Sequence, residues 1–318
     1  MQLLHTILVT PPVKLQRVDV FLSTKLRKFS RNKIQNLIHK KAILVNSKSI
    51  DADYKVQFND VIEVFSPYKE FNENITPENI PLHIVFEDSD IIVVNKPQGM
   101  PVHKGLGNYK GTLLNALAYH FLSETNKVNI EAGSVHRLDS GTSGLLVFAK
   151  NKNAQNNLEH QLKCNKMNRT YEALVWGIIN QEEGTVDVPV GRSKTNSMLI
   201  QAFPLREEGK EAVTNYKVLQ RFKFATLVQC TLQTGRTHQI RIHMQHLGHA
   251  IIGDQRYSSN FTFREVREVL ETERVAYQLL HARYLEFEHP LTKMMCRFEA
   301  PRNDVFQGVL SRLAEFAL

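Results

Sequence analysis

The stretch VHRLDSGTSGLLVFAK at residues 135–150 decides how most of this chain is organised. It places a carboxylate, Asp139, just after two basic-type side chains and just before a loop with two glycines. Residues 145–149 are all apolar and predict a buried strand, and the glycines permit a tight turn with positive φ. Asp139 would then lie on a short loop that leads into a rigid strand, where catalytic groups are often placed. An aspartate that merely begins a turn fits the same residues, and both interpretations stay open here.

The composition indicates a protein with a substantial core and a polyanionic partner. The chain has 318 residues, of which 42% are apolar, and a formal net charge of +8. For this length we expect one large domain and a small one. The positive charge favours binding to nucleic acid over binding to an anionic membrane surface.

Nothing in the sequence predicts secretion or insertion into a membrane. No apolar run approaches the length of a membrane span, and residues 1–12 lack the pattern of a secretory signal. The cysteines Cys164, Cys230 and Cys296 are far apart and have neither metal nor redox spacing. We therefore expect a cytoplasmic protein with reduced cysteines and no membrane partner.

The N-terminal segment reads as a small unit with a basic surface. Residues 18–26 and the residues after Ser30 have helical spacing, and residues 43–45 and 61–65 have strand patterns. No acid lies between Asp19 and Asp51. A solvated helix face would explain a few basic residues, but so many favour a phosphate-binding surface. The basic side chains are Lys25, Arg27, Lys28, Arg31, Lys33, Lys40 and Lys41, of which Lys28, Arg31, Lys33 and Lys41 are our predicted RNA contacts.

This segment resembles the small RNA-binding domain first seen in ribosomal protein S-four. The resemblance rests on RVDVFLSTKL at 17–26, SRNKIQNLIHKKAILVN at 30–46 and VQFNDVIEVF at 56–65, and departs at Ala42, where glycine is common. We assign residues 13–66 to this domain. Residues 67–81 contain three prolines and several polar residues, which is typical of a linker. Residues 82–318 would form the large domain.

The large domain is expected to alternate strands and helices. The loop at 96–103 is rich in Pro and Gly, which we expect to fix an irregular path rather than carry chemistry. Residues 184–204 are polar and basic at their centre and predict a hairpin that touches RNA. Strands are predicted at 83–86, 91–95, 145–149, 169–177, 213–222, 225–232, 284–287 and 294–298, and helices at 111–121, 151–162 and 263–270.

A second dense stretch, LQTGRTHQIRIHMQHLGH at 232–249, predicts a helix capped by Thr234 or Thr237. Arg241 and His238 would lie near one another on its surface. Four histidines within twelve residues raise the question of a zinc site. No cysteine is near and no His-Glu-x-x-His pattern occurs, so we predict no metal and expect structural or RNA-contacting histidines.

Residues from about 82 to 303 resemble the RluA/RluD type of RNA pseudouridine synthase. Four separated motifs match in order, and a fifth fits the end of the family's domain; the only oddity is Ala250, where proline is usual. The motifs are VNKPQGMPVH at 94–103, VHRLDSGTSGLLVFAK at 135–150, RTYEALVWG at 169–177, LQTGRTHQIRIHMQHLGHAIIGDQRY at 232–257 and LHARYLEFEHP at 280–290.

The resemblance implies a fold and a set of active-site residues. The fold would be α+β, with a mixed, largely antiparallel central sheet flanked by helices and a small N-terminal α/β RNA-binding domain. Asp139 would be the catalytic aspartate, Tyr171 the active-site tyrosine and Arg241 the arginine paired with Asp139. Arg137 would enter the RNA as the target base leaves. The neighbouring His136, Arg236 and His238 are expected to contact the RNA.

The implied reaction is the isomerisation of specific uridines in RNA, with 23S ribosomal RNA as the expected substrate. We expect the chain to act as a monomer. Because nothing is transferred from outside, no cofactor is expected. Three alternatives stay open: a synthase acting on transfer RNA, an RNA-binding ribosome assembly factor without activity, and a hydrolase using Asp139. The hydrolase would usually need a second carboxylate as acid, and we expect none at the site. For Tyr171, a half-buried structural tyrosine is the commoner role of a lone strand tyrosine.

Overall fold

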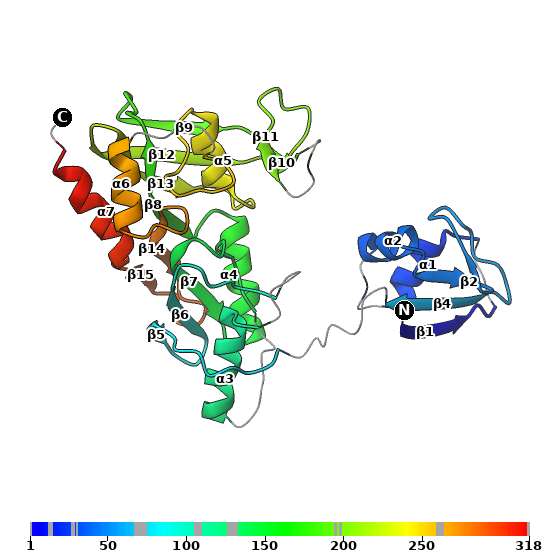
Figure 1. Ribbon diagram of the computed structural model, residues 1–318. Helices are drawn as coiled ribbons and strands as arrows, with labels where there is room; N and C mark the ends of the chain where they lie inside the picture. The colour runs from blue at the N-terminus through cyan, green and yellow to red at the C-terminus, as the bar shows by residue number, and fades with distance from the viewer. Residues whose placement is uncertain are drawn as a thin grey trace. The chain divides into compact units, whose positions relative to one another are not determined.

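The computed structural model describes residues 2–11, 15–26, 29, 31–66, 75–104, 110–125, 133–193, 196, 199–258 and 264–316. The chain divides into two compact units, Met1–Ile75 and Thr76–Leu318, each with its own hydrophobic core (Figure 1). None of the described helices is both long enough and apolar enough to cross a membrane.

The first unit packs two helices on a small antiparallel sheet. Its described strands run in the order β1-β4-β2-β3, with bounds Gln2–Leu8, Val61–Ser66, Ile43–Val45 and Lys48–Ser49, and its helices are α1 (Val18–Lys25) and α2 (Arg31–His39). Leu22 of α1, Ile34 of α2 and Ile62 of β4 are fully buried between these layers. Strand β1 precedes the predicted start of the domain at residue 13, yet it pairs with β4 from Leu8↔Val61 to Gln2↔Ser66.

A buried carboxylate ties the two helices of the first unit together. Asp19 is fully buried and accepts hydrogen bonds from Arg17, from Nε of Arg31 at 3.0 Å and from Gln35 at 2.6 Å. Burial alone would raise the pKa of Asp19, and these hydrogen bonds more than offset it, so the pKa is lowered. The Asp19 and Arg31 positions of the S-four resemblance therefore join α1 to α2.

The second unit is built on one twisted sheet (Figure 1). In the part that the structure describes, nine strands form this sheet, and only the β7–β14 pairing is parallel. The expected α+β class with a mixed, largely antiparallel sheet is thus confirmed. In sheet order the strands are β5 (Ile84–Glu87), β6 (Ile91–Lys96), β7 (Ser143–Ala149), β14 (Leu280–Glu288), β8 (Asn168–Trp176), β13 (Ala225–Leu232), β12 (Val213–Arg221) and β9 (Glu183–Asp187), with β15 (Met295–Glu299) paired to β14.

Alternating side chains on the strands supply hydrophobic clusters on both faces of the sheet. On β8, Tyr171 and Val175 point into the core that holds α3 (Leu113–Thr125) and α5 (Gln239–His246). Leu174 and Trp176 point to the other face, against α6 (Arg264–Thr272) and α7 (Asp304–Ala314). Helix α4 (Lys152–Lys163) covers β6 and β7 on the face away from α3.

Some expected elements differ in detail. The 184–204 region is not one hairpin: β9 joins β12, and β10 (Val190–Arg192) pairs with β11 (Ile200–Ala202). Helix α7 was not predicted. Phe263, expected at the start of a helix, and Ser30 and Lys194, which the basic segments contain, lie outside the described residues.

Helix α5 does not begin with a threonine cap. Its N-cap is His238, which has a left-handed φ of 57° and makes no side-chain cap. The Thr234 hydroxyl instead donates to the side-chain oxygen of Gln239 at 2.8 Å, and the same oxygen accepts from the backbone N–H of Arg236. The side chain of Gln239, the first residue of α5, therefore ties the helix to the loop before it, and Thr234 contributes to this link rather than to a cap.

Candidate active site

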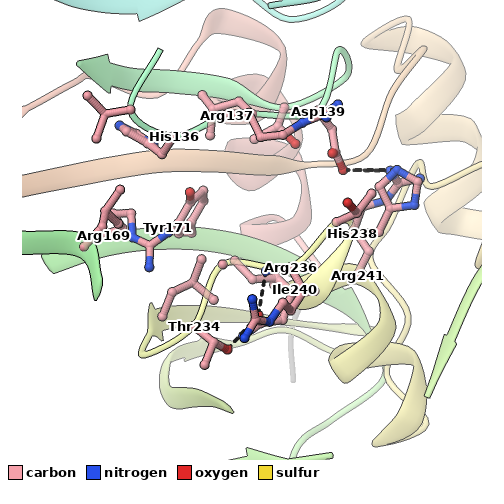
Figure 2. Close-up of a pocket in the computed structure, with 18 of the residues that line it drawn as sticks. His136, Arg137, Asp139, Arg169, Tyr171, Thr234, Arg236, His238, Ile240 and Arg241 are labelled. Carbon is pink, nitrogen blue, oxygen red and sulfur yellow. Dashed lines mark hydrogen bonds and ion pairs between the residues drawn. The ribbon is translucent and has the colours of Figure 1, made fainter. Parts of the chain in front are cut away.

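A pocket of about 690 Å³ lies on the α3 and α5 side of the large sheet (Figure 2). The loop before β7 forms one wall, β8 contributes Arg169 and Tyr171, and residues 232–241 form the opposite wall. Five side chains of the lining are Lys or Arg, and its one carboxylate is Asp139. A pocket with this charge balance favours an anionic ligand.

The loop that carries Asp139 is held from several sides. The backbone N–H of Gly99 donates to the Ser140 carbonyl at 2.9 Å, and the Gln98 side chain donates to the Gly141 carbonyl at 3.0 Å. A Cβ on Gly141 would meet the Gln278 side chain at 2.5 Å, so the loop packs closely there. The geometry around Asp139 is therefore rigid, as a catalytic position requires.

The loop is followed by Gly144, a position that no residue with a Cβ can occupy without strain. Gly144 has a φ of +111°, and a Cβ there would lie 2.3 Å from the carbonyl oxygen of Ala282. This close approach allows the one parallel pairing, Ala282↔Gly144. The predicted need for positive φ is met at Gly144 rather than at Gly141.

Lys96 is a buried cation that we did not predict as part of the site. It is 1% exposed, and its ammonium donates to the carbonyls of Pro97, Met100 and Ser140 at 2.8–3.1 Å. Burial lowers its pKa to about 7, and the nearby Asp139 opposes this shift. Three acceptors match the three protons of an ammonium, so this geometry is that of the charged form. The loop at 96–103, which we expected only to fix an irregular path, therefore also surrounds a buried ammonium group with its carbonyls.

Arg241 and Asp139 meet across the pocket, although 102 residues separate them. Nη1 of Arg241 donates to Oδ2 of Asp139 at 2.9 Å (Figure 2). Arg241 is 6% exposed, so the side of α5 that carries it and His238 faces the interior rather than solvent. Among the described residues, every recorded partner of the Asp139 carboxylate contacts Oδ2, which leaves Oδ1 available to a ligand.

A second carboxylate orients Arg241 from behind. Asp254 accepts from Nε and Nη2 of Arg241 at 2.6 Å and 2.9 Å, and its Oδ1 also accepts from the backbone N–H groups of Arg256 and Tyr257. These bonds raise the pKa of Arg241 despite its burial. Our expectation of no second carboxylate near the site is wrong. Asp254 is nevertheless fully engaged with Arg241 and does not line the pocket, so it is not placed as a free acid.

His238 lies at the side of this pair. Its Nδ1 is 2.7 Å from the Tyr257 hydroxyl, and its Nε2 is 3.7 Å from Oδ2 of Asp139. The Tyr257 ring also lies under the Arg241 guanidinium, 4.9 Å from its carbon. Burial lowers the pKa of His238, and Asp139 opposes this shift. His238 thus lies against the Asp139–Arg241 pair rather than pointing into solvent.

Tyr171 and Arg169 lie side by side on the inner wall (Figure 2). Both are nearly covered, at 5% and 7% exposure, and they project from the same face of β8. Burial raises the pKa of Tyr171, Arg169 opposes this, and Asp139 adds to it. Arg169 was not among the predicted site residues; its spacing of two from Tyr171 on one strand is the signal that could have placed it there.

The other predicted contacts occupy different depths. Arg137 is exposed at the pocket wall, and Arg236 is exposed with Nε donating to the Glu211 carbonyl at 2.9 Å. His136 lines the pocket, but its Nε2 accepts from the backbone N–H of Val147, and burial lowers its pKa to about 3. A neutral His136 therefore supports β7.

The predicted contacts of the first unit are only partly described. Arg31 uses its Nε on Asp19, and Lys41 is exposed with a left-handed φ of 54°. Lys28 and the side chain of Lys33 lie outside the described residues.

Comparisons with known proteins agree with this architecture. Residues 90–246 match the family model described as RNA pseudouridylate synthase, and residues 16–62 match the S4 domain. Ribosomal large subunit pseudouridine synthase D of Blochmanniella floridana is 38% identical over 299 residues, which cover 90% of each chain. The uncharacterized RNA pseudouridine synthase YlyB of Bacillus subtilis (strain 168) is 40% identical over 290 residues, which cover 91% of each chain.

Solved structures share the fold over most of this chain. Human RNA pseudouridylate synthase domain containing 1 gives a TM-score of 0.53 at 28% identity, over 70% of this chain and 83% of that chain. Human RNA pseudouridylate synthase domain containing 4 gives 0.61 at 23% identity, over 73% and 92%, which shows a shared fold. The relatives match along nine-tenths of the length, and the RNA-binding S4 match precedes the catalytic one, so this chain belongs to the RNA pseudouridine synthase family.

Proposed function

We propose that this chain isomerises specific uridines of large-subunit ribosomal RNA to pseudouridine, with Asp139 acting on the sugar. The observation that carries the proposal is the Asp139–Arg241 pair, at 2.9 Å, in a pocket whose other charged side chains are basic. The names of the relatives as ribosomal large subunit pseudouridine synthases support the choice of RNA. Because the pocket forms within one chain, a monomer suffices, and the cytoplasm is the compartment we assign.

The reaction conserves atoms overall. The bond from ribose C1′ to uracil N1 breaks, the ring turns, and C1′ bonds to ring carbon C5; a proton leaves C5 and N1 gains one. The chain therefore has to hold the base, stabilise the electron-poor sugar carbon and move a proton.

Asp139 supplies the negative charge at the sugar. Its Oδ1 can bond C1′, as the nucleophile of a retaining glycosidase does, or accept a ribose proton to give a glycal. Arg241 holds Oδ2, so only one oxygen is free to react, and the charge-assisted bond keeps the carboxylate in one orientation. The Asp254 contacts hold the guanidinium in the position that this requires.

The base must leave its helix to reach this depth. Tyr171, buried on the inner wall, offers its ring for stacking and its hydroxyl for removal of the C5 proton. Arg137 is exposed and can enter the space that the base vacates. Extrusion costs a few kcal/mol, which contacts of the exposed cations with phosphates offset.

Mapping of pseudouridines in cells with and without the gene tests the proposal. We expect loss of pseudouridine from large-subunit ribosomal RNA, restored by the wild-type chain but not by Asp139→Asn. Loss from transfer RNA alone would contradict the substrate. An unchanged map in cells that require the chain for ribosome assembly would favour an inactive assembly factor, and release of free uracil would favour a hydrolase.

A further inference from the structure

Arg169 is a buried cation without a hydrogen-bonding or ionic partner in the described part of the chain. It is 7% exposed, its guanidinium has no hydrogen bond or ion pair to a described residue, and its Nε is covered completely. The one neighbour that favours its charge is Tyr171. Most buried cations are paired, because leaving one without a partner costs several kcal/mol.

The surrounding chain leaves space for this guanidinium. A Cβ on Gly235, in the loop that ends at α5, would lie 2.6 Å from Nη1 of Arg169. The backbone of Gly235 has an ordinary φ, so glycine is not needed there for its conformation. The absence of a side chain at residue 235 therefore serves the approach of Arg169 into the pocket.

Depth decides which part of an RNA could reach Arg169. The exposed cations of the lining, Arg137, Lys163 and Arg236, are where a sugar-phosphate backbone would pass. Arg169 and Tyr171 are both more than nine-tenths buried and share one wall. Only a group that enters the pocket, such as an extruded base, meets both.

We propose that Arg169 is a further catalytic residue, whose guanidinium donates to a carbonyl oxygen of the extruded uracil and stabilises the ring as it departs. This inference rests on the proposed function. A base stacked on Tyr171 presents its polar edge to the residue two positions along the same face of β8. Each of the three guanidinium nitrogens of Arg241, by contrast, already donates to Asp139 or Asp254.

The interaction of Arg169 with the uracil should become stronger as the reaction proceeds. When the C1′–N1 bond breaks, its electron pair stays with the uracil, and the negative charge spreads over N1 and the two carbonyl oxygens. A preorganised donor aimed at such an oxygen interacts more strongly with the departing ring than with the bound nucleotide. The loss of one donor of this kind typically lowers kcat about 100- to 1,000-fold.

Steady-state kinetics of Arg169→Gln on the target RNA test the proposal. We expect kcat to fall about 100-fold, with KM changed less than about threefold, and Arg169→Lys to recover part of the loss. Lys163→Gln is the matched control at an exposed cation and should raise KM instead. A rise in KM for Arg169→Gln without a fall in kcat would show a phosphate contact and overturn the assignment.

A better leaving group gives the sharper measurement. Replacing the target uridine by 5-fluorouridine stabilises the ring anion by itself, so the loss caused by Arg169→Gln in the rate of consuming the target nucleoside should shrink. Equal losses on both RNAs would overturn the proposal. Wild-type activity in Asp139→Asn would instead overturn the proposed function, because the sugar chemistry would then not depend on that carboxylate.

Two further variants separate catalysis from structure. Because an unpaired buried charge destabilises the fold, Arg169→Gln should leave the Tm equal or higher; a lower Tm together with unchanged kcat would show a structural role. Gly235→Ala should displace the guanidinium and lower kcat in the wild-type chain, but not further in Arg169→Gln. Additive losses in the double variant would contradict the link between residues 169 and 235.

Discussion

Asp254→Asn should slow the reaction and leave RNA binding almost unchanged. Asp254 accepts two hydrogen bonds from Arg241, at 2.6 Å and 2.9 Å, which present the remaining edge of the guanidinium to Asp139. An asparagine keeps the size of the side chain but removes its charge and offers only one acceptor. Arg241 would then have Asp139 as its only carboxylate and could turn to bind both of its oxygens. The oxygen that we assign to the sugar would be blocked.

The magnitude follows from the contact that is displaced. A hydrogen bond to a charged group contributes about 1.5–3 kcal/mol, and about 1.4 kcal/mol changes a rate tenfold. We therefore expect kcat to fall about 10- to 150-fold. Asp254→Ala removes one partner of a buried pair altogether and should also lower the free energy of unfolding by about 3–5 kcal/mol.

The assay uses an RNA labelled with tritium at C5 of the target uridine, because that hydrogen leaves in the reaction. Tritium release at saturating RNA gives kcat, and its dependence on RNA concentration gives KM. Asp187→Asn is the control: the same substitution breaks a half-exposed ion pair with Arg206 and should change neither constant. A folded Asp254→Asn chain with normal kcat, or with only a raised KM, would refute the role of Asp254 in positioning Arg241.

Three other perturbations have definite outcomes. Gly144→Ala should lower the free energy of unfolding by at least about 2 kcal/mol, because both the positive φ of Gly144 and the nearby Ala282 carbonyl oppose a Cβ. Gly133→Ala, the control, should be nearly neutral. Equal effects of the two substitutions would contradict the prediction. The pKa of His136 is about 3 in the folded chain and 6.5 ordinarily, so its contribution to the free energy of unfolding is complete above pH 6.5 and is lost as the pH falls, by about 2 kcal/mol at pH 5. His136→Gln should remove this part of the pH dependence of unfolding. An unchanged pH dependence would show that His136 is not buried as a neutral ring. Replacing Lys25 and Lys41 by Gln should raise KM without changing kcat and reduce the salt slope of RNA binding by about 1 per residue; an unchanged slope would show that they contact no phosphate.

The sequence predicted best what depends on local patterns. Strand β7 is apolar at nearly every position and is buried throughout, as the run at 145–149 indicated. Strands β8, β12 and β13 have the branched and aromatic content that predicts strands. The pairing of Asp139 with Arg241 came from the family resemblance rather than from spacing, because no local pattern connects residues 102 positions apart.

What the sequence did not predict depends on distant partners. Strand β1 forms because β4 offers it an edge, and Lys96 is held by carbonyls that the loop brings around it. Asp254 was not predicted as part of the site, because its contact with Arg241 exists only in the folded chain. Burial of Arg241 likewise requires the sheet beneath α5.

The most direct test of the account is a single-turnover reaction of Asp139→Asn with bound target RNA. Asparagine has nearly the same shape and can still accept a hydrogen bond from Arg241, but it has neither the charge nor the reactive oxygen. We predict no detectable pseudouridine and an RNA affinity within about threefold of wild type. A threefold change corresponds to less than about 1.4 kcal/mol of binding free energy, which would change the affinity tenfold. Pseudouridine formed at the wild-type rate would contradict the account.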